Sequence, residues 1–398
     1  MRILHVYRTY FPDSQGGLEE VIRQICLNAK SEGIESRVFA LSRAPSSKPI
    51  SREEAELYQV QQTFELASCG VSISALRTFR QQAAWADVIH YHYPWPFADI
   101  LHLSARIKKP TLVTYHSDIV RQRLLGRIYR PLMKRFLGQV ERLICTSPNY
   151  FATSDVLTEF AHKVKVIPIG VTESSYPKPE EDVTEHVKAA FGEGFFLFVG
   201  VLRYYKGLHI LLDAVHNQDM RVVIAGSGPI ESSLKDQART LGLHNVTFAG
   251  QVDDRTKVSL FLLAKAVVFP SYLRSEAFGV TLLEGAMYGK PLISTEVGSG
   301  TSHVNVDKQT GHVVAPGSAM ELRRAMQKLS DNPSAAAMLG RNARKRYEEL
   351  FTGELMGKRY AQVYCELAPN ASTASKSLSL ANVAGSSEQT RPAVRRIS

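Results

Sequence analysis

Cysteine is scarce in this sequence. Four cysteines occur among 398 residues, and no two of them have the Cys-x-x-Cys spacing. They are Cys26, Cys69, Cys145 and Cys365. Zinc ribbons and disulfide frameworks both need closer, patterned cysteines, so the sequence indicates neither. A reduced, cytoplasmic location is therefore the default expectation.

Long apolar runs are missing as well. No window approaches the roughly 20 apolar residues that a membrane-spanning helix needs. The apolar start, residues 1–7, is too short for a secretory signal because Arg8 interrupts it at once. We therefore expect residues 1–7 to form a first strand, and we expect any contact with a membrane to be peripheral.

A complete dinucleotide-binding fingerprint is also missing. Gly226 and Gly228 follow an expected strand at 221–225, but Pro229 comes next and no third glycine stands where the fingerprint requires one. The next expected strand, 246–250, has no acid at its end, although two acids follow it closely. The glycine turn by itself therefore does not indicate a dehydrogenase.

Apart from these absences, the composition of the sequence is ordinary except for its net charge. The hydrophobic share of 44% and the charged share of 22% are typical of globular proteins. A length of 398 residues suggests two domains. The net charge of +10 suits an anionic small substrate, nucleic acid or an acidic membrane face, and charge alone does not choose among them.

Short β-branched and aromatic runs alternate with helical patterns in both halves of the chain, which predicts two α/β domains with parallel sheets. The runs lie at 2–7, 37–41, 87–92, 111–116, 142–147 and 164–170, and then at 195–200, 221–225, 246–250, 266–270, 291–295 and 310–314. The polar stretch 44–65 is interpreted as a loop. A polar, proline-containing stretch at 172–182 is interpreted as the linker, with the boundary near Gly170.

Two glutamates stand out after the strand at 266–270. Glu276 falls in the expected loop, and Glu284 falls one turn inside the helix that begins after Phe278 and Gly279. Free N–H groups at such a helix start suit an anion. Carboxylates suit the hydroxyls of a sugar or ribose. A nucleotide sugar carries both kinds of group.

Basic and glycine residues occupy other strand-to-helix junctions. Arg203 and Lys206 follow the strand at 195–200, where two cations can hold a diphosphate. Gly16 and Gly17 open a helix, and a glycine pair there allows a ligand to approach the backbone. A tight turn is the alternative interpretation of this pair.

Two of the expected strands end in histidine, at 87–92 and 111–116. The carboxyl ends of parallel strands are where ligands bind in open sheets. A lone histidine is more often structural than functional. For His90 and His92 both roles stay open.

The pattern Glu-x7-Glu with Phe-Gly after the first glutamate resembles the retaining glycosyltransferases of family 4, which have the GT-B fold. The resemblance covers Met1 to about Leu367. It implies two Rossmann-like domains that face each other across a cleft, 1–170 on the acceptor side and 171–354 binding the nucleotide sugar. It also implies a helix at 355–367 that crosses back to the first domain. The Ser- and Ala-rich tail, 368–398, is expected to be disordered.

The resemblance assigns roles to individual residues. Glu276 would contact the hydroxyls of the transferred sugar, Glu284 the ribose of the nucleotide, and His116 the sugar from the opposite domain. Gly16 and Gly17 would face the donor phosphates and the acceptor. The donor phosphate's own oxygen would serve as the base for the acceptor.

The two expected phosphate-binding cations match the family motif unequally. Lys206 matches the lysine of the family motif, whereas the motif's arginine falls on Val201 and the nearby arginine is Arg203. Arg203 would reach the phosphate only through a shifted or shortened loop. The Gly226 and Gly228 turn also occurs in the family. No Asp-x-Asp stands at a strand end, so neither a metal nor another cofactor is expected.

Finer features resemble bacterial mannosyl- and rhamnosyltransferases that build lipid-linked polysaccharide. They are Val-Leu-Arg-Tyr-Tyr-Lys-Gly at 201–207 and Tyr-His-Ser-Asp-Ile-Val at 115–120. They imply a GDP-sugar donor and a polyprenyl-diphosphate-linked acceptor, and no nucleic acid partner. The stretch 119–143 predicts a basic amphipathic helix, interrupted or kinked at Pro131. It would either dock on an anionic cytoplasmic membrane or present a solvated basic face.

Three other classes stay open. A glycoside hydrolase also uses two acids, but it would leave the phosphate-suited loops without a role. A sugar-nucleotide epimerase of similar architecture would alter the sugar without an acceptor. A non-catalytic nucleotide-binding scaffold is compatible with the displaced arginine.

Overall fold

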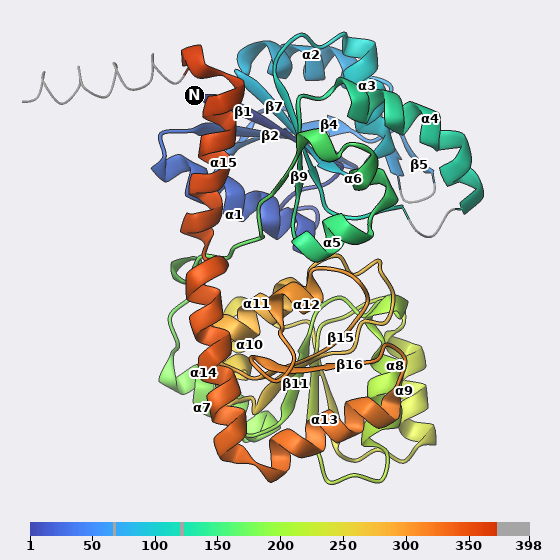
Figure 1. The fold of residues 1–398 in the computed structure, drawn as a ribbon, viewed down its shortest axis with the longest axis vertical. Coiled ribbons are helices and arrows are strands. Elements are labelled where there is room, and N and C mark those ends of the chain that lie inside the picture. Colours follow the sequence, from blue (N-terminus) through green and yellow to red (C-terminus); the bar gives the residue numbers. More distant parts are fainter. Residues whose placement is uncertain (67–68, 120–122, 372–398) are drawn as a thin grey trace, which may run out of the picture.

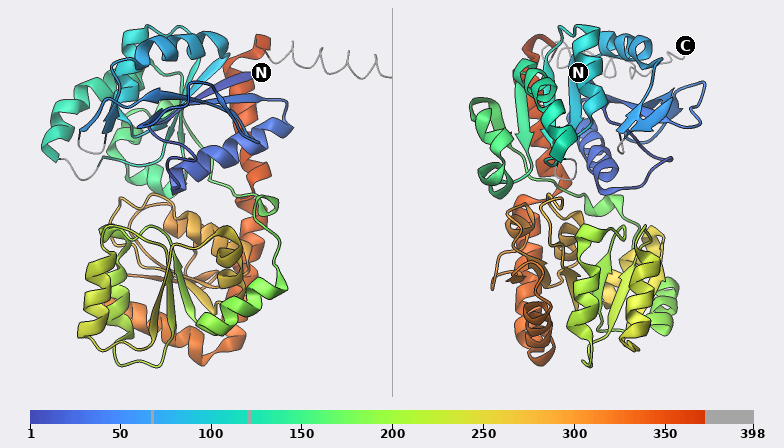
Figure 2. Two further views of the ribbon diagram at one scale, coloured as in Figure 1. Left: turned by 180° about the vertical axis from the view of Figure 1, so that it is seen from behind. Right: turned by 90° about the vertical axis from the view of Figure 1, so that its right-hand side faces the viewer.

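The computed structural model describes residues 1–66, 69–119 and 123–371. Two α/β domains lie one above the other, and each has a sheet with helices on both faces (Figures 1 and 2). This is the arrangement that the alternation of strands and helices predicts.

The first domain contains an eight-stranded sheet with the order β10-β9-β8-β7-β1-β2-β4-β3. All neighbours are parallel except β3 and β4. The strands are β1 (Arg2–Val6), β2 (Glu35–Ser42), β3 (Ile50–Ser51), β4 (Glu56–Gln61), β7 (Val88–Tyr93), β8 (Thr111–Tyr115), β9 (Arg142–Cys145) and β10 (Val164–Val166). A small hairpin of β5 (Phe64–Leu66) and β6 (Cys69–Val71) lies beside it. The strand order reverses between β1 and β7, and their carboxyl ends therefore form a crevice suited to ligands.

The second domain contains six parallel strands with the order β13-β12-β11-β14-β15-β16. They are β11 (Phe196–Val199), β12 (Val222–Ala225), β13 (Val246–Gly250), β14 (Ala266–Phe269), β15 (Leu292–Thr295) and β16 (Gly311–Val314). In chain order this is 3-2-1-4-5-6, the order of Rossmann nucleotide-binding domains. Its reversal point lies between β11 and β14, so the loops after these two strands flank the ligand crevice.

Helices cover both sheets. The first domain has α1 (Gly17–Ser31), α2 (Ala75–Trp85), α3 (Pro96–Ala105), α4 (Arg123–Gln139), α5 (Pro148–Thr153) and α6 (Asp155–Glu159). The second has α7 (Glu181–Phe191), α8 (Leu208–Val215), α9 (Glu231–Thr240), α10 (Asp254–Leu263), α11 (Val280–Met287), α12 (Thr301–Val304), α13 (Ala319–Asp331) and α14 (Pro333–Leu350). Pro131 lies inside α4, which continues through it. Among the described residues, none of the helices combines the length and the apolarity that crossing a bilayer requires.

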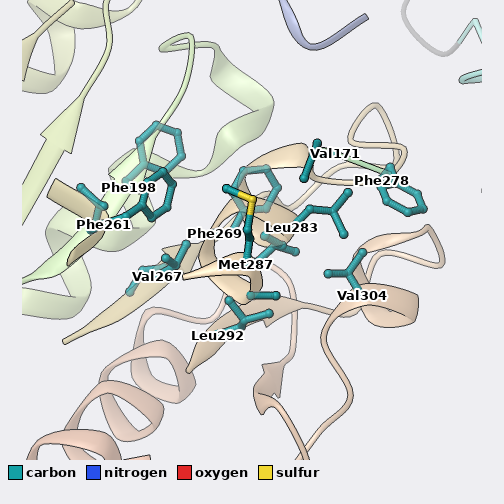
Figure 3. Packing of buried hydrophobic residues seen from close by; sticks show 14 of the residues in the cluster. Val171, Phe198, Phe261, Val267, Phe269, Phe278, Leu283, Met287, Leu292 and Val304 are labelled. Carbon is teal, nitrogen blue, oxygen red and sulfur yellow. The ribbon is translucent and has the colours of Figure 1, made fainter. Parts of the chain in front are cut away.

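The core of the second domain fixes helix α11 against the sheet (Figure 3). Leu283 and Met287 are buried against the strands, and Phe278 is buried just ahead of the helix. Gly285 permits this close approach, because a Cβ there would lie 2.7 Å from a side-chain carbon of Val267. Each such buried apolar side chain contributes roughly 1.5–3 kcal/mol. The packing therefore sets the orientation of Glu284 on the same helix.

The chain passes from one domain to the other twice, and the two crossing segments lie side by side. Val171 forms a parallel bridge with Thr352, and the last helix, α15 (Gly353–Leu367), then packs along α1 of the first domain (Figure 1). Gly357 allows this contact, since a Cβ there would lie 2.5 Å from the Cβ of Asn28. The expected crossing helix is therefore present, and the chain's last described element belongs spatially to its first domain.

One expectation was wrong. The stretch 44–65 is not a loop, because it contains β3, β4 and the start of the hairpin. Only Leu57 and Val60 of β4 are buried, and its polar residues face outward, so the strand lacks the apolar run that predicts one. The tail from residue 372 onward lies outside the described residues.

Candidate active site

A cleft of about 720 Å³ opens where the two domains face each other. It lies at the carboxyl ends of β1, β8, β11 and β14, the positions that the two strand-order reversals predict. All eleven residues predicted from the sequence line it: Gly16, Gly17, His116, Arg203, Lys206, Gly226, Gly228, Glu276, Phe278, Gly279 and Glu284. The structure thus brings together residues that are up to 268 positions apart, from Gly16 to Glu284.

An ion pair joins the loops after β11 and β14. The ammonium group of Lys206 contacts a carboxylate oxygen of Glu276, and the two side chains are only 13% and 10% exposed. Lys206 also lies over the ring of Phe269, with its nitrogen 4.4 Å from the ring centroid. The lysine charge is therefore held at the crevice by an anion and an aromatic face before any ligand arrives.

The loop that carries Glu276 is fastened to the first domain. Arg274 forms an ion pair with Asp118, Nε to Oδ2 at 3.2 Å, and its guanidinium stacks over the Tyr150 ring at 4.5 Å. Ala277 packs against the apolar core of the first domain. Neither contact could be predicted, since each depends on how the domains face one another. Together they hold Glu276 toward the segment that follows β8.

His116 lies in that segment and is 3% exposed. Its Nε2 is 3.1 Å from Nδ1 of His92, and its Nδ1 has no hydrogen-bond partner in the part of the chain that the structure describes. Burial lowers the pKa of His116 to about 3, so the ring is neutral at pH 7. His90 and His92 are buried in the core behind it, in β7.

Glu284 has two partners that sequence reasoning missed. Its Oε1 accepts a hydrogen bond from the Tyr176 hydroxyl at 3.0 Å and lies 3.1 Å from the Lys257 ammonium. Burial acts to lower the pKa of Lys257, but the charges of Glu284 and Asp254 outweigh it and raise that pKa. Lys257 stays charged and is a further cation in the wall of the cleft, besides Lys206 and Arg203. No motif marks Lys257 or Tyr176, which come from a helix surface and the linker.

The start of α1 forms the opposite wall. Gly16 caps the helix, and at Gly17 an added Cβ would meet nothing within 4 Å, so the backbone there faces open space. Glu19, which no motif marks, accepts hydrogen bonds from Thr9 and Ser14 at 2.8 and 2.7 Å. These bonds tie the glycine loop to the helix start.

Three other glycines are required by the backbone. Gly226 has φ of 132°, and a Cβ there would lie 2.1 Å from the carbonyl oxygen of Gly200. Gly228 similarly approaches the backbone of Leu202. Gly279 has φ of 88° and caps α11, whose N-terminus opens on the cleft. The first two therefore hold two cleft loops together, besides lining the site.

Arg203 reaches the cleft although the family's arginine position is occupied by Val201. Both residues line the cleft, and Arg203 precedes a short 3-10 turn at Tyr204–Lys206. Among the described residues its guanidinium makes no ion pair, in contrast to Lys206 and Lys257. Within the described part of the chain, Arg203 therefore lines the cleft without an ion-pair partner.

A second hollow of about 430 Å³ adjoins these loops. Tyr93, Tyr115, Asp118 and Arg274 are in its wall, and the two tyrosine rings stack with centroids 4.5 Å apart. Asp118 and Arg274 are each next in the chain to a residue that lines the main cleft, Ser117 and Ser275. Aromatic faces beside charged hydrogen-bonding groups suit a saccharide.

The main cleft thus offers cations that include Lys206, Arg203 and Lys257, together with a helix N-terminus, to a diphosphate. It offers carboxylates that include Glu276 and Glu284, together with a neutral imidazole, to hydroxyl groups. Among the described residues, the one cluster with metal-ligand spacing is that of His5, His90 and His92 in the core of the first domain. The cleft's chemistry fits a sugar linked to a nucleoside diphosphate.

Known proteins agree with this chemistry. Residues 15–175 match the family described as Glycosyltransferase Family 4, and residues 182–346 match Glycosyl transferases group 1. The D-rhamnosyltransferase WbpZ of Pseudomonas aeruginosa is 51% identical over 352 residues, which cover 88% of this chain and 92% of WbpZ. The O-antigen chain mannosyltransferase C of Escherichia coli is 46% identical over 367 residues, covering 92% and 99%.

Solved structures show the same fold. Sucrose-phosphate synthase from Thermosynechococcus elongatus has a TM-score of 0.77 at 22% identity, with 92% of this chain and 98% of that chain covered. HepE from Anabaena, in complex with UDP, has a TM-score of 0.71 at 19% identity, covering 92% and 100%. The family matches decide among the open enzyme classes in favour of glycosyl transfer. The chain belongs to glycosyltransferase family 4, and it is a glycosyltransferase with the GT-B fold.

Proposed function

We propose that this enzyme transfers mannose or rhamnose from a GDP-sugar to a lipid-linked polysaccharide precursor, in the synthesis of O-antigen, with retention of the anomeric configuration. One observation carries the site assignment: Lys206 and Glu276 are paired in the same cleft that His116 of the opposite domain lines. The names of the two relatives, a D-rhamnosyltransferase and an O-antigen chain mannosyltransferase, support the sugar and the pathway.

In the proposed reaction the bond between the anomeric carbon and the diphosphate oxygen breaks, and negative charge grows on the departing diphosphate. Lys206, Arg203 and the N-terminus of α11 stabilise that charge, because fixed positive groups aimed at developing charge lower the barrier. The acceptor hydroxyl attacks the anomeric carbon on the same face. Its proton passes to the oxygen of the leaving phosphate.

The remaining residues position the sugar nucleotide. Glu276 accepts hydrogen bonds from the hydroxyls of the transferred sugar, and His116 contacts that sugar from the first domain. Glu284, held by Lys257 and Tyr176, receives the ribose hydroxyls. The acceptor saccharide approaches through the hollow beside Asp118 and Arg274, whose aromatic and charged wall suits it.

A panel of nucleotide sugars tests the proposal. With a lipid extract as acceptor, we expect release of GDP from GDP-mannose or GDP-rhamnose, and less than one-tenth of that rate from UDP-sugars. NMR of the product should show the anomeric configuration of the donor. Because the cations and the helix N-terminus meet the diphosphate, EDTA should change the rate by less than two-fold. Use of UDP-sugars alone, or an inverted product, contradicts the proposal.

Helix α4 provides the proposed contact with the membrane. Its apolar residues Met133, Phe136 and Leu137 are buried in the first domain, whereas Arg130 and Arg135 are exposed. The apolar face is thus used for packing, and the exposed arginines remain for an anionic leaflet, at about 1 kcal/mol each. We expect the Arg130→Glu, Arg135→Glu double variant to bind vesicles rich in phosphatidylglycerol at least ten-fold more weakly in a sedimentation assay.

The matched control reverses two exposed charges on the second domain. Lys235 and Arg239 lie on α9, with side chains 49% and 77% exposed. Their replacement by glutamate changes the net charge equally but leaves α4 intact. An equal loss of vesicle binding in both double variants would show a general charge effect and would exclude α4 as the docking surface.

A further inference from the structure

Arg274 connects both domains at their boundary. Its Nε donates a hydrogen bond to Oδ2 of Asp118 at 3.2 Å, and its guanidinium lies over the ring of Tyr150, 4.5 Å from the ring centroid. Both of these partners belong to the first domain. In the second domain, Nη1 of Arg274 donates to the carbonyl oxygen of Gly298 at 3.2 Å. One side chain therefore joins the loops that follow β8, β14 and β15.

The first domain holds the Asp118 carboxylate ready for this contact. Oδ1 of Asp118 accepts hydrogen bonds from the hydroxyls of Tyr115 and Ser154, at 2.8 and 2.9 Å. Its backbone N–H donates to the hydroxyl oxygen of Tyr150 at 2.6 Å. All three partners lie in the same domain as Asp118. The carboxylate is therefore oriented by its own domain, and the ion pair forms when the second domain brings Arg274 to it.

Two further hydrogen bonds cross the boundary beside this pair, where α5 and α12 face each other (Figure 1). The hydroxyl of Thr153 donates to the same carbonyl oxygen of Gly298 at 2.6 Å, and Nδ2 of Asn149 donates to Oγ of Ser302 at 3.1 Å. Gly298 has φ of 66°, which glycine adopts without strain. Its carbonyl oxygen thus accepts one hydrogen bond from each domain.

Arg274 and Asp118 each lie close in the chain to a residue that the proposed function places against the transferred sugar. Arg274 precedes Glu276 by two residues, and Asp118 follows His116 by two. Two residues of chain span at most about 7 Å. Contact between Arg274 and Asp118 therefore limits how far Glu276 and His116 can separate, and its loss would allow the two sides of the sugar site to move apart.

The groups that meet the nucleotide do not depend on this boundary. Lys206 contacts Glu276, and Lys257 contacts Glu284, entirely within the second domain. Gly279, which caps α11, belongs to that domain as well. Loss of Arg274 should therefore leave the nucleotide site intact while it disturbs the placement of the sugar between the domains.

We propose that Arg274 is a positioning residue: through Asp118 it holds Glu276 and His116 on the two sides of the transferred sugar, and it supports turnover without supporting nucleotide binding. The roles of Glu276 and His116 in this statement rest on the proposed function. The contact between the domains does not, because it is made by side chains of the protein alone.

Direct binding of the acceptor is the competing role for Arg274, since its side chain lies in the wall of the second hollow. Each of its three guanidinium nitrogens, however, already donates to the protein. Their acceptors are Asp118, Gly298 and the carbonyl oxygen of Tyr150, the last at 3.5 Å. The Tyr150 ring also covers one face of the guanidinium. These contacts favour positioning over direct binding.

The first test measures the contact between the domains and needs no substrate. Cysteines in place of Asn149 and Ser302, whose side chains touch across the boundary, can form a disulfide only when the domains meet. In this background we expect Arg274→Met to slow disulfide formation at least five-fold, measured by mass spectrometry of the linked peptide. Equal rates overturn the proposal, and so does the absence of the disulfide in the parent. Failure of the nucleotide-sugar panel would leave this result unaffected.

The second test separates turnover from binding. Because displaced reacting groups cost rate, we expect Arg274→Met to lower kcat about ten-fold with the donor that the panel identifies. Affinity for that donor's nucleotide, measured by calorimetry, should stay within two-fold. Arg323→Met is the matched control, since Arg323 donates to the carbonyl oxygens of Ala214, Asp213 and His216 inside the second domain. It should leave both quantities within two-fold. Unchanged kcat in Arg274→Met, or a ten-fold loss of nucleotide affinity, overturns the proposal.

A double-mutant cycle tests whether Asp118 is the partner through which Arg274 acts. Asp118→Asn removes the charge and should lower kcat by about the same factor as Arg274→Met. The double variant should be no slower than the slower single variant, because the second change finds the contact already lost. Losses that multiply would show independent roles and overturn the proposal. A higher amount of lipid extract for half-maximal rate in Arg274→Met, with kcat unchanged, would assign Arg274 to the acceptor instead.

Discussion

Replacement of Lys206 by methionine should lower kcat about 10³-fold and raise the KM for the donor at least ten-fold. The lysine is the paired cation at the reversal point of the second sheet, in the cleft where the diphosphate is proposed to leave. Loss of one fixed group that stabilises transition-state charge costs roughly 10²–10³ in kcat. The expected loss is at the upper end because the lysine charge also neutralises Glu276.

The second effect appears in KM. Without Lys206, the Glu276 carboxylate keeps its charge beside the place where an anionic diphosphate must bind. Two like charges roughly 5 Å apart repel by about 3 kcal/mol at an effective dielectric constant of about 20. The double variant Lys206→Met, Glu276→Gln should therefore recover most of the donor KM of the parent enzyme. Its kcat should stay as low as that of Lys206→Met, or lower.

Steady-state kinetics with varied donor measure both quantities. Lys235→Met is the control, because Lys235 forms an exposed ion pair with Glu231 on α9, at 2.7 Å. It should leave kcat and KM unchanged within two-fold. A double variant whose donor KM stays as high as that of Lys206→Met would show that repulsion by Glu276 is not the cause. A Lys206→Met enzyme with near-parental kcat would remove the lysine from the proposed mechanism.

Much of the cleft could be predicted from the sequence because its residues follow strands that are strongly apolar. The run at β14 is fully buried, the run at β11 is buried except for Val199, and both end in breakers, so the loops after them are easily located. In parallel sheets such loops gather at one edge. Lys206 and Glu276 were therefore predictable as neighbours, although they are 70 residues apart.

What the sequence did not reveal depends on contacts between elements. Lys257 and Tyr176 look like ordinary surface residues until α10 and the linker are placed against Glu284. The pair of Arg274 with Asp118 exists only because the domains face each other in this orientation. Such contacts involve single residues, and no pattern of residue spacing along the chain predicts them.

The same reasoning applies to strand β4 and to the buried histidines of β7. Strand β4 pairs with β2, but only Leu57 and Val60 among its residues are buried, and the others are polar or half-buried. So weak an apolar pattern does not distinguish a strand from a loop in the sequence. His92 looked equivalent to His90 in the sequence. The register of β7 against β1 and β8 gives them different partners: Thr114 and Tyr364 for His90, His5 and His116 for His92.

Replacement of Glu276 by glutamine should lower kcat about 10²-fold without raising the donor KM. Glutamine keeps an acceptor oxygen for the sugar hydroxyl but loses the charge, and a hydrogen bond to a charged group contributes about 1.5–3 kcal/mol. At 1.36 kcal/mol for each factor of ten, this corresponds to one or two orders of magnitude. The same change frees Lys206 from its partner, so the donor diphosphate should bind as well as before or more tightly.

Glu284→Gln should behave differently although it removes the same charge from the same cleft. The ribose is remote from the breaking bond, so its contacts are equal in the bound and transition states, and their loss appears in KM and not in kcat. We expect the donor KM to rise about ten-fold with kcat within three-fold of the parent value. Steady-state kinetics of the two variants, with Glu231→Gln as a half-buried control on the same domain, separate the roles. Only a group near the breaking bond can act on the transition state alone. If both variants lose kcat equally with unchanged KM, the assignment of Glu276 to the transferred sugar and of Glu284 to the ribose is therefore wrong.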